Sequence, residues 1–263
     1  MKLGFVAYSS KGSLLDVRND LLSIAQSAGL DCLRYDDAAA VKADPSRVDV
    51  LVVVGGDGSL LHNAAAVSGE EIPILGVNLG RIGFLSEITA DEFSANLGRL
   101  IHGDYEIDER MMLSGRINND PARFCLNDFT LFKRTFSGVA QVEVSINNMH
   151  INTVYCDGMI VATPTGSTAY AFSVGGPVMA PDLDAILVAP VCSHTLTMRP
   201  YVAAPDAMVE LRIAGDGFVT VDGEQEMGVG PQDRIFITSA DQRTRFIRFG
   251  TKNIFELIKT KLA

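Results

Sequence analysis

The sequence predicts an α/β protein made of a doubly wound, Rossmann-like N-terminal domain and a β-rich, sandwich-like C-terminal domain. Strand-like and helix-like segments alternate from Leu3 to Gly103, as they do in parallel α/β layers. From about Tyr105, short alternating runs are separated by Asn, Gly, Pro and Asp clusters, which is typical of antiparallel sheets. We therefore divide the chain into residues 1–103, 104–248 and a final helical segment, 249–263.

In the N-terminal domain, the strongest strand signal is the β-branched run Asp49–Val54, which is expected to be buried on both faces. The other expected strands are Leu3–Tyr8, Asp31–Tyr35 and Ile74–Val77. Apolar spacing predicts helices over Leu14–Ala28 and Leu60–Val67, and a third that runs from Thr89 or Asp91, as caps, to Leu100 before Gly103.

In the C-terminal domain, period-two alternation predicts strands, and one helix is expected to begin near Ser167 or Thr168. Examples of such strands are Met112–Ile117, Gln141–Ile146, Val209–Ile213, Phe218–Val221 and Arg234–Ile237. The last segment, Asn253–Leu262, has the apolar spacing of an amphipathic helix.

The composition narrows the class of partner. The 263 residues carry 22 Lys and Arg against 32 Asp and Glu, a formal charge of −10. A protein this acidic is a poor match for a nucleic-acid backbone, whereas a small nucleotide can be held by backbone N–H groups and a few cations. No apolar run is long enough for a membrane span, and the four cysteines lack metal-ligand spacing. We expect a cytoplasmic protein with reduced thiols and no membrane partner.

A glycine-rich turn, Gly55-Gly56-Asp57-Gly58-Ser59, stands between the buried strand and the next helix. Its glycines allow backbone N–H groups to approach a ligand, and the helix N-terminus favours an anion. An aspartate in such a phosphate cradle repels its ligand unless it binds a metal ion or takes a proton from an attacking hydroxyl. The alternative interpretation is a tight turn in which Asp57 caps the following helix.

A second cluster runs from Asp157 through a hydroxyl-rich loop, Thr163-Pro164-Thr165-Gly166-Ser167-Thr168-Ala169-Tyr170, to Gly175-Gly176-Pro177. Its hydroxyl groups offer donors and acceptors to sugar or phosphate oxygens, and Tyr170 offers a flat face to a base. A well-capped helix after a proline-containing turn explains the same residues without a ligand.

Together these segments resemble the NAD kinase family over most of the chain. The resemblance is carried by Gly55–Ser59, the NxGxxGFL run Asn78–Leu85, the pair Asn127-Asp128, and the DGxIxxTPTGSTAYxxSxGGP run that begins at Asp157. The GGDG turn alone is shared with lipid kinases and, in variant form, with phosphofructokinases, whereas the longer runs are more restrictive.

The resemblance implies that ATP phosphorylates the 2′-hydroxyl of the adenosine ribose of NAD, with Asp57 as proton acceptor. It further implies a divalent cation such as Mg²⁺, polyphosphate as donor in some relatives, a homodimer or homotetramer, and a final helix that packs on the N-terminal domain. The implied nucleotide-binding residues are Gly55, Gly56, Asp57, Gly58, Ser59, Asn127, Asp128, Asp157, Thr168, Ala169, Tyr170 and Ser173.

Several positions depart from the family pattern or stand beside it. Tyr155 replaces a frequent arginine and Cys192 a frequent alanine. Asp222-Gly223-Glu224-Gln225 resembles the DGQ motif of the family with one residue added, and either Glu224 or Gln225 takes the place of its glutamine. His62 is either a phosphate ligand or an exposed helix residue, and Arg81 either a ligand cation or a loop residue. Lys133 and Arg134 are expected to form a solvated rim.

Two other functions fit part of the pattern. A lipid kinase would share the GGDG turn, but the hydrophilic TPTGSTAY loop and the lack of a membrane-docking segment disfavour it. A non-catalytic NAD(P)-binding sensor would have little reason to keep Asp57 in its phosphate cradle.

Overall fold

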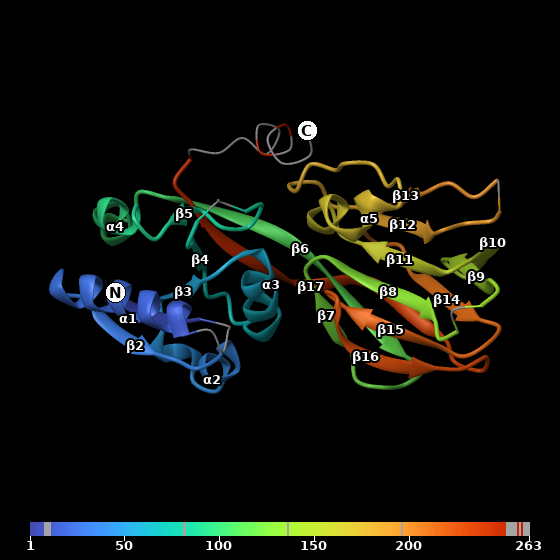
Figure 1. Cartoon of the computed structure of the whole chain (residues 1–263), viewed down its shortest axis with the longest axis horizontal. Helices are drawn as coiled ribbons and strands as arrows, with labels where there is room; N and C mark the ends of the chain where they lie inside the picture. The colour runs from blue at the N-terminus through green and yellow to red at the C-terminus, as the bar shows by residue number, and fades with distance from the viewer. Residues whose placement is uncertain are drawn as a thin grey trace. The chain divides into compact units, whose positions relative to one another are not determined.

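The computed structural model describes residues 1–7, 12–80, 83–135, 137–195 and 197–250, together with Leu257 and Lys259. Apart from these last two residues, the helix expected over 253–262 lies outside the described residues. The chain divides into two compact units, one formed by Met1–Glu109 with Arg243–Ala263 and the other by Arg110–Gln242. The strands β6 (Glu106–Ile117) and β17 (Ile235–Arg248) continue from one unit into the other (Figure 1).

The first unit is built on a parallel sheet of order β17-β4-β3-β1-β2, in which β4 also pairs with β5. Besides the end of β17, its strands are β1 (Lys2–Val6), β2 (Asp31–Arg34), β3 (Val50–Val54), β4 (Ile74–Asn78) and β5 (Ile88–Thr89). Its helices are α1 (Gly12–Ser27), α2 (Ala38–Lys42), the 3₁₀ turn η1 (Pro45–Arg47), α3 (Asp57–Ala66) and α4 (Phe93–His102).

Helices cover both faces of this sheet, and every residue of β3 is therefore buried. Alternate residues Val50, Val52 and Val54 join a core with α1 and α4, and the residues between them point to the other face, where α3 packs. The connections β1–α1–β2 and β3–α3–β4 run in opposite directions along the sheet, which is the doubly wound arrangement. The glycine-rich turn follows β3 at the carboxyl ends of the strands, where such sheets bind ligands.

The second unit is an antiparallel β-sandwich. One sheet has the order β13-β12-β11-β8-β15-β16, and the other contains β10-β9-β14-β17 and the pair β6–β7. Its further strands are β7 (Arg123–Cys125), β8 (Asp128–Lys133), β9 (Ala140–Ile146), β10 (Met149–Cys156), β11 (Gly158–Ala162), β12 (Ile186–Val191), β13 (Tyr201–Ala203), β14 (Val209–Ile213), β15 (Gly217–Val221) and β16 (Glu224–Val229). Inward-facing residues of both sheets form one core, so the predicted fold class is confirmed for both units.

A short irregular segment covers the outer face of β11 and β12. Where one helix was expected, the chain forms a 3₁₀ turn, η2 (Thr165–Thr168), and one turn of helix, α5 (Tyr170–Ser173). Ala171 and Met179 of this segment pack on Ile160, Ala162 and Leu187. None of the helices in the described ranges is both long and apolar enough to cross a membrane.

Candidate functional site

The glycine-rich turn leads directly from β3 into α3. Gly55 has φ of 150°, and a Cβ there would overlap the side chain of Ser59, so only glycine fits. Gly56 is the N-cap of α3, and both Gly56 and Gly58 are exposed. The first amide groups of the helix therefore lie at the protein surface beside small residues, an arrangement that suits a phosphate.

The Asp57 carboxylate is held by a second loop. Phe84 N donates to Asp57 Oδ2 at 2.8 Å, and Leu85 N donates to Asp57 Oδ1 at 3.1 Å. Gly83 lies so close that a Cβ would overlap this carboxylate. The capping interpretation is therefore wrong, because the carboxylate binds amides of the loop after β4 instead of those of α3. The GFL part of the NxGxxGFL run, which only its family resemblance had singled out, thus holds the Asp57 carboxylate. Arg81 of the same run lies outside the described residues.

In the second unit, the pair Asn127-Asp128 stands where the chain enters β8, and another carboxylate holds this turn. Asp222 accepts hydrogen bonds from the backbone N–H groups of Leu126, Asn127 and Asp128 at 3.0, 2.7 and 3.2 Å. Asp222 itself has φ of 51°, a conformation that is uncommon outside glycine. The sequence showed Asp222 only as part of a motif match, so its role as a clamp was missed.

The pKa values of Asp222 and of the neighbouring Asp128 are both raised. Burial raises the pKa of Asp222 to about 6, and the neighbouring Asp128 charge acts in the same direction while the three amide donors oppose it. Burial also raises the pKa of Asp128, whose Oδ1 accepts a hydrogen bond from Thr130 Oγ1 at 2.7 Å.

The hydroxyl-rich loop uses most of its hydroxyl groups internally. Thr163 Oγ1 donates to Leu126 O at 2.5 Å and accepts from Gly166 N, and Ser167 Oγ bonds Pro164 O and Met179 N at 2.6 and 3.0 Å. Thr163 and Ser167 are fully buried. The expectation that these two hydroxyls face a sugar or phosphate is therefore wrong; they hold the loop against Leu126 and the segment that follows.

The remaining loop residues are more accessible. Thr168 and Ala169 are half-buried, Ser173 is exposed, and Tyr170 keeps 38% of its surface exposed while its ring lies 5.9 Å from that of Phe132. Burial of part of the ring raises the pKa of the Tyr170 hydroxyl.

Asp157 forms an ion pair that the sequence did not suggest. Lys133 Nζ lies 2.7 Å from Asp157 Oδ1 and also donates to Gly138 O, and the Lys133 side chain is only 13% exposed. The hydrogen bond from Lys133 holds the pKa of the Asp157 carboxyl below its usual range, with smaller contributions from Cys192 and His194. The expected solvated rim is therefore wrong for Lys133 and correct for Arg134, which is half exposed beside Glu226.

The residues that depart from the family pattern are found in several places. Tyr155 and Cys192 are exposed on neighbouring segments, since His194 N donates to Tyr155 O at 2.7 Å and Cys192 contributes to the pKa of Asp157. His62 is half-buried in α3. The side chain of Gln225 lies outside the described residues. All four cysteines are free thiols.

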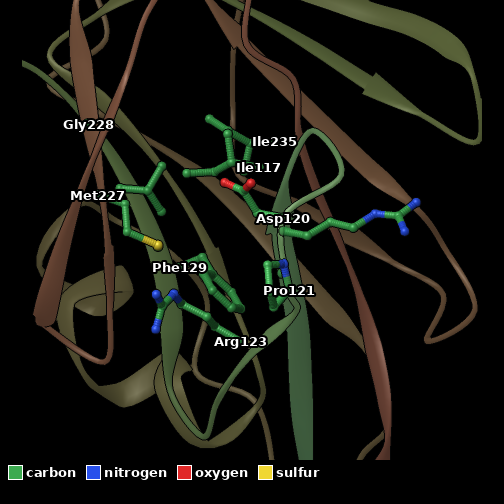
Figure 2. A pocket seen from close by; sticks show the side chains of 11 residues that line it. Ile117, Asp120, Pro121, Arg123, Phe129, Met227, Gly228 and Ile235 are labelled. Carbon is green, nitrogen blue, oxygen red and sulfur yellow. The ribbon is translucent and has the colours of Figure 1, made fainter.

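A cavity of about 190 Å³ lies within the second unit. Figure 2 shows Ile117, Phe129, Met227 and Ile235 around it, with the charged Asp120 and Arg123 among them. None of the nucleotide-binding residues expected from the sequence lines it. Among the described residues, no group of three or more His, Cys, Asp and Glu side chains could hold a metal ion.

Two protein-family matches cover most of the chain. Residues 11–105 match the ATP-NAD kinase N-terminal domain, and residues 126–249 match the ATP-NAD kinase C-terminal domain. The NAD kinase of Geotalea daltonii is 40% identical over 225 residues, covering 83% of this chain and 79% of that protein. That of Syntrophotalea carbinolica is 38% identical over 246 residues, covering 91% and 85%.

Two solved structures have the same fold. Yeast NADH kinase complexed with NADH aligns with a TM-score of 0.86 at 20% identity, covering all of this chain and 87% of that one. An NAD kinase from Archaeoglobus fulgidus in complex with ATP aligns with a TM-score of 0.83 at 23% identity, covering all of this chain and 98% of that one. From its domain matches and its relatives at about 40% identity, the chain belongs to the NAD kinase family.

Proposed function

We propose that the protein transfers the γ-phosphate of ATP to the 2′-hydroxyl of the adenosine ribose of NAD, giving NADP, with Asp57 as the proton acceptor. In a chain of this family, the observation that carries this proposal is the Asp57 carboxylate. It stands in the glycine-rich turn at the start of α3, and two amides of the loop after β4 fix it.

The protein takes little covalent part in this reaction. A bond forms between the ribose 2′-oxygen and the γ-phosphorus, the bond from the γ-phosphorus to the β–γ bridging oxygen breaks, ADP leaves, and the hydroxyl proton passes to Asp57. In a loose phosphoryl-transfer transition state, the nucleophile needs orientation more than early deprotonation. A carboxylate in a fixed orientation supplies this, and the exposed amide groups of the turn would bind phosphate oxygens.

The second unit would bind the dinucleotide. We assign the adenosine to Asn127 and Asp128, with Thr168, Ala169, Tyr170 and Ser173 around the adenine, and the nicotinamide end to Asp157. The partial exposure of Tyr170 supports stacking of its ring on a base, and the clamp by Asp222 supports a loop that is ordered before NAD binds. Lys133 would supply the positive charge that Tyr155 cannot.

The donor would be the magnesium complex of ATP. Since no cluster of carboxylates and histidines for a metal ion is found in the described ranges, the ion would be carried by the phosphates of the nucleotide. The chemistry that the ion would supply there is neutralisation of the negative charge that develops during transfer. Polyphosphate remains a candidate donor. We propose that the protein is cytoplasmic and forms a homodimer or homotetramer, and light scattering measures this oligomeric state.

The direct test is to incubate the purified protein with ATP, Mg²⁺ and NAD and to measure NADP with a dehydrogenase-coupled assay. Sustained NADP formation is expected. Phosphorylation of diacylglycerol in place of NAD would indicate a lipid kinase, and tight NAD binding without turnover on ATP or polyphosphate would indicate a sensor.

A further inference from the structure

The loop that holds Asp57 is itself anchored to the last strand of the sheet. This loop, residues 84–87, lies between β4 and β5, and its amides at Phe84 and Leu85 bind the Asp57 carboxylate. Arg248, the final residue of β17, reaches it from 163 positions further along the chain, where its Nη1 donates to Leu85 O at 2.9 Å. Leu85 therefore bonds Asp57 through its N–H group and Arg248 through its carbonyl group.

Glu87 makes the anchor two-sided. Its Oε2 lies 3.3 Å from Arg248 Nη1, and its Oε1 accepts a hydrogen bond from Phe249 N at 2.9 Å. The backbone N–H of Glu87 donates to Gly76 O of β4 at 2.8 Å. The loop is thus tied to strands on both sides, β4 through its backbone and β17 through an ion pair.

The contacts between Glu87 and Arg248 are buried, which limits how the loop can rearrange. The Glu87 side chain is 1% exposed and that of Arg248 is 16% exposed. Arg248 Nε is also bound by Asp108 Oδ2 at 2.9 Å, which fixes the plane of the guanidinium group. A buried carboxylate that loses its cation is strongly destabilised, so the pair permits few alternative arrangements of the loop. Lysine cannot reproduce these contacts, because one ammonium group must replace the separate Nε and Nη1 donors.

From these contacts we infer that Arg248 and Glu87 are positioning residues for phosphoryl transfer: they set the orientation of the Asp57 carboxylate through Leu85. This inference rests on the proposed role of Asp57 as proton acceptor. Neither side chain needs to touch a substrate. Removing the anchor allows the loop to shift, which misaligns Asp57 while leaving the nucleotide-binding residues in place.

The test is a double-mutant cycle on turnover. Arg248→Met is expected to lower kcat roughly tenfold, since small misplacements of a catalytic group have effects of this order, while the KM values for NAD and ATP change less than about twofold. In an Asp57→Asn background, Arg248→Met is expected to have no further effect on kcat. Arg248→Lys should give an intermediate kcat.

Arg245→Met is the matched control. Arg245 lies on the same strand and pairs with Glu109 at 3.2 Å and Glu71 at 3.9 Å, neither of which belongs to the loop. Its removal is expected to leave kcat within about twofold of wild type. Thermal melting of each variant separates loss of turnover from loss of folded protein. Should Arg248→Met fail to fold, Glu87→Gln replaces it in the cycle, because glutamine keeps an oxygen for Phe249 N and loses the charge and the acceptor that face Arg248.

The outcomes distinguish the role of Asp57 as proton acceptor from the positioning role of Arg248. Wild-type turnover in Asp57→Asn would overturn the role of Asp57 and this inference with it. A large loss in Asp57→Asn, combined with an independent and multiplicative loss from Arg248→Met, would overturn the positioning role alone. So would a folded Arg248→Met variant with normal kcat.

Discussion

In the described part of the chain, two or more main-chain amides hold the carboxylate of Asp57 in the first unit and that of Asp222 in the second. A carboxylate accepts several such bonds in fixed directions, whereas an amide side chain offers one oxygen and turns an N–H group toward the same donors. Substitution by Asn is therefore a sharp test of either residue, because size is kept and both charge and acceptor geometry are lost.

Asp57→Asn is expected to lower kcat roughly 10²-fold or more, because it removes the proton acceptor, with little change in the Kd for NAD. Single-turnover kinetics and NAD titration by calorimetry measure the two quantities separately. Near-normal turnover would reduce Asp57 to a structural residue.

Asp222→Asn is expected to raise the KM for NAD about tenfold, because the loop carrying Asn127 and Asp128 loses charge-assisted bonds of roughly 1.5–3 kcal/mol each, partly replaced by water. The kcat should change little. If instead kcat falls and KM is unchanged, the clamp does not act through NAD binding.

At the scale of elements, the loop after β4 leaves no room beside Asp57. Gly83→Ala is expected to lower kcat by a factor comparable to Asp57→Asn, because the added Cβ occupies the space of the carboxylate. Gly80→Ala is the control in the same loop, since a Cβ there meets nothing within 4 Å. Steady-state kinetics of both variants, with melting curves, provide the comparison; equal activities would mean that the loop accommodates the methyl group.

The segment from η2 to Met179 depends on one buried hydroxyl. Ser167→Ala leaves Met179 N and Pro164 O without that partner, so the free energy of unfolding should fall by about 1–3 kcal/mol. Urea unfolding measures the change. Thr168→Ala, at a half-buried position, should cost clearly less, and equal losses would argue against the special role of Ser167.

For the whole molecule, Asp222 links pH to both stability and NAD binding. Its folded pKa of about 6 lies above the ordinary aspartate value, so the native state holds a proton that the unfolded chain has released between about pH 4 and pH 6. The contribution of Asp222 to stability is therefore fully present below pH 4 and is lost as the pH rises to 6. The pKa of Asp157 is lowered by Lys133, and that of Glu210, in β14, by hydrogen bonds from Arg234 and Arg212. These two carboxylates act oppositely and lose their contributions as the pH falls through their folded pKa.

Binding should show the reverse of the Asp222 stability effect, because only the ionised carboxylate accepts all three amide bonds. The KM for NAD is expected to rise as the pH falls from 7 to 5, with an inflection near 6, and to lose this inflection in Asp222→Asn. The Asp128 carboxyl beside it also has a raised pKa and would remain as a smaller dependence. Wild-type and variant profiles that coincide would exclude Asp222 as the titrating group.

The sequence predicted the local features well, because they are written in short runs. The buried run Asp49–Val54 is β3 within one residue, and the glycine-rich turn stands where a doubly wound sheet places a ligand. Side-chain direction was less predictable: the hydroxyls of Thr163 and Ser167 turn inward, and Lys133 is covered. Nothing in local spacing reveals that Asp222 clamps Asn127 or that Arg248 reaches Leu85, since such contacts exist only after the chain has folded.

The return of β17 to the first unit also has a consequence during synthesis. A ribosome makes the glycine-rich turn and the loop that holds Asp57 well before it makes Arg248 and the strand that pairs Phe246 with Ile74. A nascent or prematurely terminated chain that stops after residue 109 thus carries Asp57 without the anchor of its loop. If Asp57 has its proposed role, capacity for phosphate transfer is in this way deferred until the end of β17 has been made.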